Sequence, residues 1–282
     1  MQLGDREQAR FSRCTDVGGV ELLTARFVDH RYAPHVHQSY AIAVVEAGAE
    51  RYRYRGEEHV VSAGHLALLN PDEVHTGHKA ADDGWRYRVF YPEPRQFQVL
   101  LDELELPSGA PALRGSVHRD DHLVPALLDL HRQLQDPLVS VLQRQTSWRE
   151  VMLQLLQRHA QASVRATAGR EPLAVSRAKE LLAARLAEPP SLEELAAAVN
   201  LSPFHFARVF RRATGLPPHS WLMQRRLQQA RALLRDGCAP LHVALQLGFA
   251  DQSHLGRQFK QAYGVAPGEY RSACARRFDT VS

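Results

Sequence analysis

The sequence predicts an α+β protein in two parts: a β-sandwich or barrel with trailing helices, then an all-α domain with two helix-turn-helix motifs. Three observations lead to this fold class. Short segments of alternating polar and apolar residues recur at near-regular spacing between residues 20 and 91, as in all-β domains. Apolar residues take helical spacing from about residue 120. Two later stretches each join a short helix to a second, capped helix through a tight turn.

Size and composition agree with a two-domain globular protein. The chain has 282 residues, 44% of them hydrophobic, and no apolar run long enough to span a membrane. Because the first residues are polar, we expect no signal peptide. The three cysteines, Cys14, Cys238 and Cys274, have neither metal-binding nor redox spacing. We therefore expect a cytoplasmic protein with free thiols.

The N-terminal part has the pattern of a series of short strands. Residues 1 to about 11 are charged and are expected to be loose, and strand alternation begins at Val20 and continues to Phe27. Further strands are expected over residues 34–46, 51–55, 59–62, 66–69 and 84–91. Turn residues at Gly48, Gly56 and Asn70 separate them.

The strand expected over residues 34–46 carries two histidines on one face. Side chains alternate across a strand, so His35 and His37 share a face with Ser39, Ala41, Ala43 and Val45. Apart from the histidines this face is small, which leaves space inside a barrel. The sequence therefore predicts an internal cavity for a small molecule beside the two histidines.

The next strand alternates tyrosine with arginine. If Tyr52 and Tyr54 face inward, the arginines at 51, 53 and 55 face solvent, the commoner arrangement for charged side chains. Arg86 and Arg88 raise the same question one strand later, and an inward Arg88 would indicate a carboxylate on the ligand. The sequence leaves open which of these side chains face inward, because strands of such barrels often contain bulges.

Helical spacing follows. Leu123, Leu127, Leu128, Leu130 and Leu134 fit one helix, and the apolar residues of 138–159 fit a second. This spacing suits a dimer interface and equally suits packing against the barrel. A linker is predicted over residues 161–172, which are rich in Ala, Ser, Thr and Gly. We therefore divide the chain into a barrel domain (1–118), a helical region (119–160), the linker (161–172) and an all-α domain (173–275).

The first helix-turn-helix motif begins at Ser191, which has capping-box spacing with Glu194. Its short helix ends near Asn200, and Ser202 caps a second helix with Pro203 at the first position. Helical spacing turns some residues of this second helix inward, namely Phe206, Val209 and Phe210. It leaves others outside, namely Phe204, Ala207, Arg208 and Arg211.

The second motif runs from Pro240 to Gly264. Gly248 ends its first helix, and Asp251 caps a helix whose inward residues are Leu255, Phe259 and Tyr263. Its outward residues are Gln252, Ser253, Gly256, Arg257 and Lys260. One such motif is equally compatible with an ordinary packed helix pair. Two in tandem, joined by a helix over residues 221–235, favour recognition of the DNA major groove.

This C-terminal stretch resembles the DNA-binding domain of AraC/XylS-family transcription regulators. The resemblance is carried by Ser191-Leu-x-x-Leu-Ala, Leu201-Ser-Pro-x-x-Phe-x-Arg-x-Phe-Arg, Gly215, Gly248-Phe249, Gly264, Pro267 and Tyr270-Arg271. It implies base contacts from Phe204, Ala207, Arg208, Gln252, Ser253, Gly256 and Arg257. Since Ala207 and Gly256 offer no hydrogen bond, we expect base readout by Arg208, Gln252 and Arg257, with Phe204 and Ala207 on a thymine methyl. Arg211 and Lys260 are expected on phosphates, and Arg212 belongs to the same DNA-binding surface.

The N-terminal part resembles the cupin-like jelly-roll sensing domain of many such regulators. His35-x-His37, Gly48, Gly64 and Asn70-Pro-Asp-Glu-Val-His75 carry this resemblance. The candidate effector-binding residues are His35, His37, Tyr52, Tyr54, His75, Trp85, Tyr87 and Arg88. In metal-binding cupins a glutamate four or five residues after the second histidine completes the ligand set, and here Ala41 and Ile42 occupy those positions. We expect no metal cofactor. One alternative is a site for zinc, iron or nickel on His35, His37 and His75. The other is plain hydrogen-bonded packing of these three rings.

Charge supports DNA as the partner. Residues 171–282 carry 15 Lys and Arg against 9 Asp and Glu, whereas residues 1–170 carry 20 against 22. The sequence thus predicts a sequence-specific DNA-binding transcription regulator controlled by a small-molecule effector in the barrel. We expect a homodimer, no membrane association, and RNA polymerase as a further candidate partner. The alternative is a metal-dependent cupin enzyme, with isomerase or dioxygenase chemistry at His35, His37 and His75 and an accessory DNA-binding domain.

Overall fold

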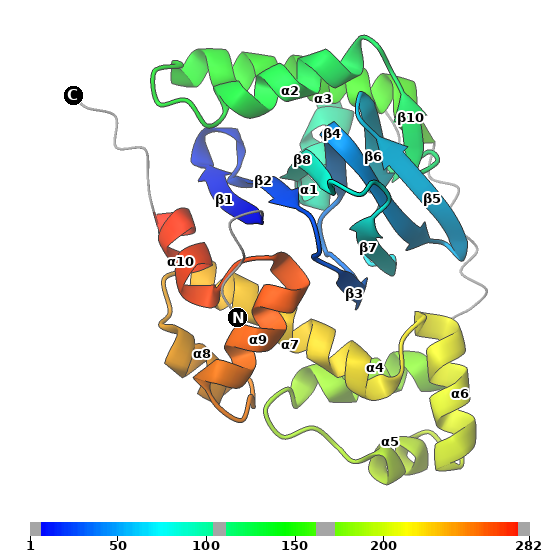
Figure 1. Cartoon of the computed structure of the whole chain (residues 1–282). Helices are drawn as coiled ribbons and strands as arrows, with labels where there is room; N and C mark the ends of the chain where they lie inside the picture. Colours follow the sequence, from blue (N-terminus) through cyan, green and yellow to red (C-terminus); the bar gives the residue numbers. More distant parts are fainter. Residues whose placement is uncertain (1–6, 104–110, 162–172, 276–282) are drawn as a thin grey trace. The chain divides into compact units, whose positions relative to one another are not determined.

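The computed structural model describes residues 7–103, 111–161 and 173–275. The chain divides into two compact units, one made of residues 1–164 with 272–282 and the other of residues 165–271. Antiparallel strands with trailing helices form the first unit, and helices alone form the second, which agrees with the predicted fold class (Figure 1). The predicted linker over 161–172 lies, apart from Gln161, outside the described residues.

The β domain is organised around the long strand β4 (Ala41–Tyr54). The first half of β4 pairs with β6 (His65–Leu69) and β8 (Trp85–Tyr91), and its second half pairs with β5 (Glu57–Ser62) and β7 (His75–Lys79). One sheet has the order β1-β2-β8-β4-β6-β10, with β1 at Gln8–Cys14, β2 at Val20–Phe27 and β10 at Val117–Arg119. Strand β3 (Tyr32–His35) pairs with β7. Strand β4 therefore takes part in both groups of strands.

A β-bulge in β4 reverses the parity of its side chains. The register with β8 shifts between Val45 and Ala47. Before the bulge the odd-numbered Val45 lies opposite Tyr87, and beyond it the even-numbered Tyr54 lies opposite His75. Because residues opposite each other share a face, the bulge places Tyr52 and Tyr54 on the interior face and sends the arginines of the same segment outward.

Three helices cover the outer face of the sheet. They are α1 (Pro94–Glu103), α2 (Leu123–Gln133) and α3 (Val141–His159), and α2 and α3 run side by side along the β domain (Figure 1). Ile42, Val44 and Phe90 form one core with Leu127 and Met152. The predicted leucine pattern of α2 and α3 therefore packs against the sheet. Helix α1 was not predicted, although Phe97, Leu100 and Leu101 have helical spacing and are buried.

The structure differs from the predicted strands in several places. The turn predicted at Gly48 lies inside the continuous strand β4, and three further differences concern other segments. Residues 8–14 form β1 instead of a loose segment, since they pair in register with β2 and bury Phe11. The strand predicted over 34–46 is interrupted between β3 and β4. There the backbone bonds to loops, with Asp72 N donating to His37 O (2.7 Å) and Tyr40 N donating to Pro92 O (3.0 Å). The third difference is β7, which was not predicted as a strand.

The helical unit begins with α4 (Leu173–Ala184) and then holds two helix pairs separated by α7 (Pro218–Arg235). The first pair is α5 (Leu192–Ala198) and α6 (Pro203–Thr214), and the second is α8 (Pro240–Gln246) and α9 (Gln252–Tyr263), followed by α10 (Pro267–Ala275). The predicted caps are confirmed: Ser191 and Glu194 form a capping box, and Ser202 and Asp251 cap α6 and α9. In the described part of the chain, none of the helices has the length and apolar character needed to cross a membrane.

Candidate functional site

Three histidines that are distant in sequence meet inside the β domain. His35 ends β3, His37 lies in the connection to β4, and His75 opens β7. Their ring centroids are 4.8 Å (His35–His37), 4.2 Å (His35–His75) and 5.0 Å (His37–His75) apart. All three side chains are buried, with exposed fractions of 5%, 8% and 6%. The sequence predicted this grouping, although it placed His35 and His37 on one continuous strand.

Backbone carbonyls fix the orientation of two of these rings. His35 Nδ1 lies 2.8 Å from Ala33 O, and His75 Nδ1 lies 3.0 Å from Glu73 O. Since a carbonyl oxygen can only accept, each Nδ1 carries the proton and each Nε2 keeps its lone pair in the neutral ring. Burial, reinforced by the neighbouring His75, lowers the pKa of His35 well below its ordinary value, and burial lowers that of His75 to about 4. Both rings are therefore neutral near pH 7.

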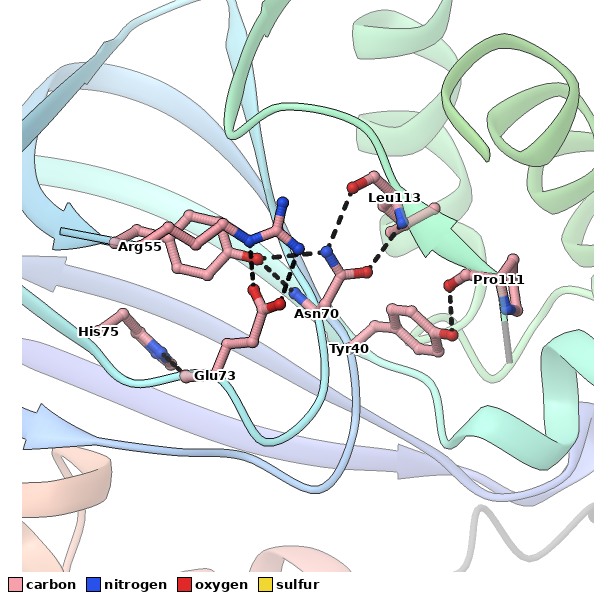
Figure 2. Close-up of polar contacts among 8 residues, drawn as sticks. Tyr40, Arg55, Asn70, Glu73, His75, Pro111 and Leu113 are labelled. Atoms are coloured by element: carbon pink, nitrogen blue, oxygen red, sulfur yellow. Dashed lines mark hydrogen bonds and ion pairs between the residues drawn. The ribbon is translucent and has the colours of Figure 1, made fainter. Parts of the chain in front are cut away.

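The turn before His75 is anchored on both sides (Figure 2). The Glu73 carboxylate accepts two hydrogen bonds from Arg55, at 2.8 and 2.7 Å. The Asn70 amide donates to Tyr54 Oη and to Leu113 O, both at 3.2 Å, and its oxygen accepts from Leu113 N at 2.8 Å. These bonds hold the 70–74 turn, and with it the carbonyl that orients His75.

The interior also contains a carboxyl group that the sequence analysis missed. Beyond the bulge Glu50 shares the parity of Tyr52 and Tyr54, and its Oε1 reaches within 2.4 Å of the position that a side chain at Gly77 would occupy. Burial raises the pKa of Glu50 to about 8. Nearby, Tyr32 and Tyr87 share a hydrogen bond between their hydroxyls at 3.0 Å. Only the position of the bulge, which the sequence leaves open, reveals that Glu50 faces inward.

The other candidate effector residues divide into two groups. Tyr52, Tyr54, Trp85 and Tyr87 are buried in the β domain. Arg88 lies on the opposite face of β8 from Tyr87 and donates to Glu46 (2.9 Å) and to His131 Nδ1 of α2 (3.2 Å). This corrects the assignment of Arg88 to the effector site, because its guanidinium points toward the helices and is already paired there.

The second functional surface lies on α6 and α9. Phe206 and Phe210 are buried in α6, and Leu255, Phe259 and Tyr263 in α9. The candidate DNA-binding residues lie on the remaining faces of these helices. Most are exposed, namely Phe204 (80%), Arg208, Arg211, Arg212, Gln252, Ser253 and Arg257. Ala207 and Lys260 are half-buried. An exposed phenylalanine on the first turn of a capped helix has an apolar ring available to a partner.

Family models match most of the chain. Residues 17–152 match the AraC-like ligand binding domain, and residues 195–273 match a helix-turn-helix domain. The β domain with its covering helices and the two helix pairs thus correspond to two known modules.

Relatives and solved structures agree with the family models. The HTH-type regulator YbfI of Bacillus subtilis, named as uncharacterized, is 24% identical over 236 residues, which are 84% of this chain and 86% of that protein. The arabinose operon regulatory protein of Escherichia coli is 26% identical over 253 residues, 87% of this chain and 84% of that protein. ToxT from Vibrio cholerae shares the fold, with a TM-score of 0.54, 12% identity, and coverage of 96% of this chain and 98% of that one.

Proposed function

The chain belongs to the AraC/XylS family of transcription regulators, and from this premise we propose that it binds specific DNA sites under the control of a small-molecule effector held in the β domain. The observation that carries the proposal is the pair of capped helices α6 and α9, each burying one face and presenting basic or amide side chains on the other. A helix of this kind fits the major groove and reads base edges.

We assign distinct roles to the exposed side chains of these helices. Arg208, Gln252 and Arg257 read bases, because arginine pairs with guanine and glutamine with adenine in the major groove. Phe204 and Ala207 contact a thymine methyl. Ser253 bonds a base edge, and Arg211, Arg212 and Lys260 neutralise phosphates. All of these side chains except the half-buried Ala207 and Lys260 are exposed to solvent, which supports these roles.

The effector binds beside the histidine cluster in this proposal. The interior offers imidazoles, the Tyr32–Tyr87 hydroxyl pair and the Glu50 carboxyl, which favour a polar ligand rich in hydrogen-bonding groups. One solved structure of ToxT holds an unsaturated fatty acid; the polar interior of the present chain favours a different ligand class. Coupling between effector and DNA of ~1–3 kcal/mol would change operator affinity ~5- to 150-fold.

We also propose a cytoplasmic homodimer without enzymatic activity. The apolar residues of α2 and α3 are used in packing on the sheet, but Leu138 (91% exposed) and Leu142 (74% exposed) near the start of α3 are available to a second copy. RNA polymerase is a further proposed partner. The enzyme alternative is not favoured, since relatives over most of the chain are regulators and Ala41 and Ile42 occupy the positions of a carboxylate ligand.

Genome-wide occupancy of the protein in its own cells tests this function, followed by footprinting of the strongest site at about 0.15 M salt, where nonspecific binding is weak. We expect discrete sites with two protected major-groove segments about one helical turn apart. Effector candidates suggested by the neighbouring genes are then titrated during operator binding. Absence of discrete sites would contradict the regulator, whereas an operator affinity unchanged by every ligand that binds the β domain would contradict effector control.

A further inference from the structure

We propose that His35, His37 and His75 form a binding site for a divalent transition-metal ion of the Zn²⁺ class, with three imidazole ligands and one coordination position left open. The inference goes beyond the proposed function, because metal binding can be measured without DNA and without an effector. It rests on the geometry of the three rings, on the groups that orient them, and on the chemistry of the three ligands.

The three rings converge closely enough to share one ion. One nitrogen from each histidine lies within 4.8 Å of the corresponding nitrogen of the other two. Tetrahedral coordination with Zn–N distances of about 2.0–2.1 Å places ligand nitrogens roughly 3.4 Å apart. The rings must therefore close by about an ångström. Rotation of the His37 ring about its side-chain bonds would supply this movement.

The hydrogen bonds around the cluster prepare the rings for a metal. A metal-bound histidine usually donates its second ring N–H to a carbonyl or carboxylate, which fixes both tautomer and orientation. His35 and His75 already make such bonds through Nδ1, to Ala33 O and Glu73 O. Their Nε2 lone pairs are therefore the groups available for coordination.

The turn over residues 70–74 links the ligands to one another. Asp72 N donates to His37 O at 2.7 Å, and the same turn supplies the carbonyl of Glu73 that orients His75. The two-pronged bond from Arg55 to Glu73 and the Asn70 amide hold this turn in place (Figure 2). One braced segment thus orients the His75 ring and holds the backbone at His37, a partly pre-formed arrangement that lowers the cost of binding an ion.

The composition of the cluster determines the charge of an ion bound there. Within the described residues the metal-ligating group consists of these three histidines alone. An ion held only by neutral ligands keeps its full positive charge, so its open position suits water or an anionic oxygen of a ligand.

Metal content and metal affinity of the full-length chain, purified without a histidine tag, test the site. Zinc is measured after purification without chelator, and the metal-free protein is then titrated with Co²⁺, whose visible absorption reports nitrogen coordination. We expect one ion per chain, with the affinity reduced at least ~100-fold in His37→Gln and in His75→Gln. His65→Gln is the matched control, because His65 is a half-buried histidine of the same domain that bonds Ser62 and Ala63 outside the cluster.

Two results would overturn the site. The first is Co²⁺ binding by the wild-type chain that is no tighter than binding by the triple variant His35→Gln, His37→Gln, His75→Gln. If that variant does not fold, the wild-type chain alone decides: Zn²⁺ in excess over its Kd must raise the melting temperature of the β domain above the value in chelator, and Mg²⁺ must not. An unchanged melting temperature together with a Co²⁺ spectrum of the hydrated ion is the second contrary result.

Discussion

Truncation of one arginine in each recognition helix separates base readout from simple charge attraction. Arg208 in α6 and Arg257 in α9 are exposed, and they point away from the buried faces of their helices. Replacing either by alanine removes no buried contact, so the free energy of unfolding should change by less than about 0.5 kcal/mol. The loss of a two-pronged guanine contact costs ~1–3 kcal/mol, which raises the Kd for the operator ~5- to 150-fold.

Fluorescence anisotropy with the footprinted operator and a scrambled duplex of equal composition, over a series of salt concentrations, measures this effect. We expect each variant to lose affinity for the operator only, with losses that add in the double variant because the two arginines lie in separate motifs. Arg177→Ala is the control, since Arg177 is an exposed arginine of α4 outside both motifs. Equal losses on both duplexes, with a salt slope shallower by about one, would refute base readout and indicate phosphate contacts.

Three predictions concern the β domain and are checked by chemical or thermal unfolding. Because folded Glu50 keeps its proton up to a pKa of about 8 while the unfolded chain releases it near 4.5, wild-type stability falls as pH rises through that window, by at most ~1.4 kcal/mol per pH unit. Glu50→Gln should remove this slope, and equal slopes for both proteins between pH 5.5 and 8 would disprove the burial of Glu50. Asn70→Ala should cost ~1–3 kcal/mol for each group left unpaired in its network with Leu113 and Tyr54, and a loss below about 0.5 kcal/mol would show that the network is dispensable. Gly48→Ala should prevent stable folding, because φ at Gly48 is +70° and the new Cβ would lie 2.0 Å from Gly84 O. The matched control is Gly56→Ala, which should cost only ~1–2 kcal/mol of stability, because φ is +87° but the space around it is open. Equal losses of stability in the two variants would refute the steric argument.

Local patterns determined much of the helical unit. A helix cap depends on a few adjacent residues, so Ser191 with Glu194, and likewise Ser202 and Asp251, could be read directly from the sequence and are found as caps. The inward positions of Phe206 and Phe259 follow from the period of the helix alone. The outward set, which contains the candidate DNA contacts, was therefore available from the sequence as well.

The β domain is different, because its arrangement depends on pairing between distant segments. The alternation of residues 51–55 indicated that tyrosines and arginines lie on opposite faces of the strand. Only the bulge near Ala47 decides that Tyr54 and Glu50 are on the inward face. Arg88 lies one residue from the buried Tyr87, and its direction was decided by pairing with Glu46 and by the packing of α2. No local signal contains that information.

The histidine cluster shows both contributions in one site. The sequence by itself determined which residues were candidates, because His35-x-His37 and the Asn70–His75 segment carry the resemblance to a cupin-like sensing domain. Only the tertiary structure decided that the three rings meet, since the strand expected to carry both His35 and His37 is interrupted, and the turn before His75 is fixed by bonds to distant segments. Side-chain chemistry and helix period are local properties and can be read from the chain, whereas register, bulges and buried partners arise only when distant segments pack together.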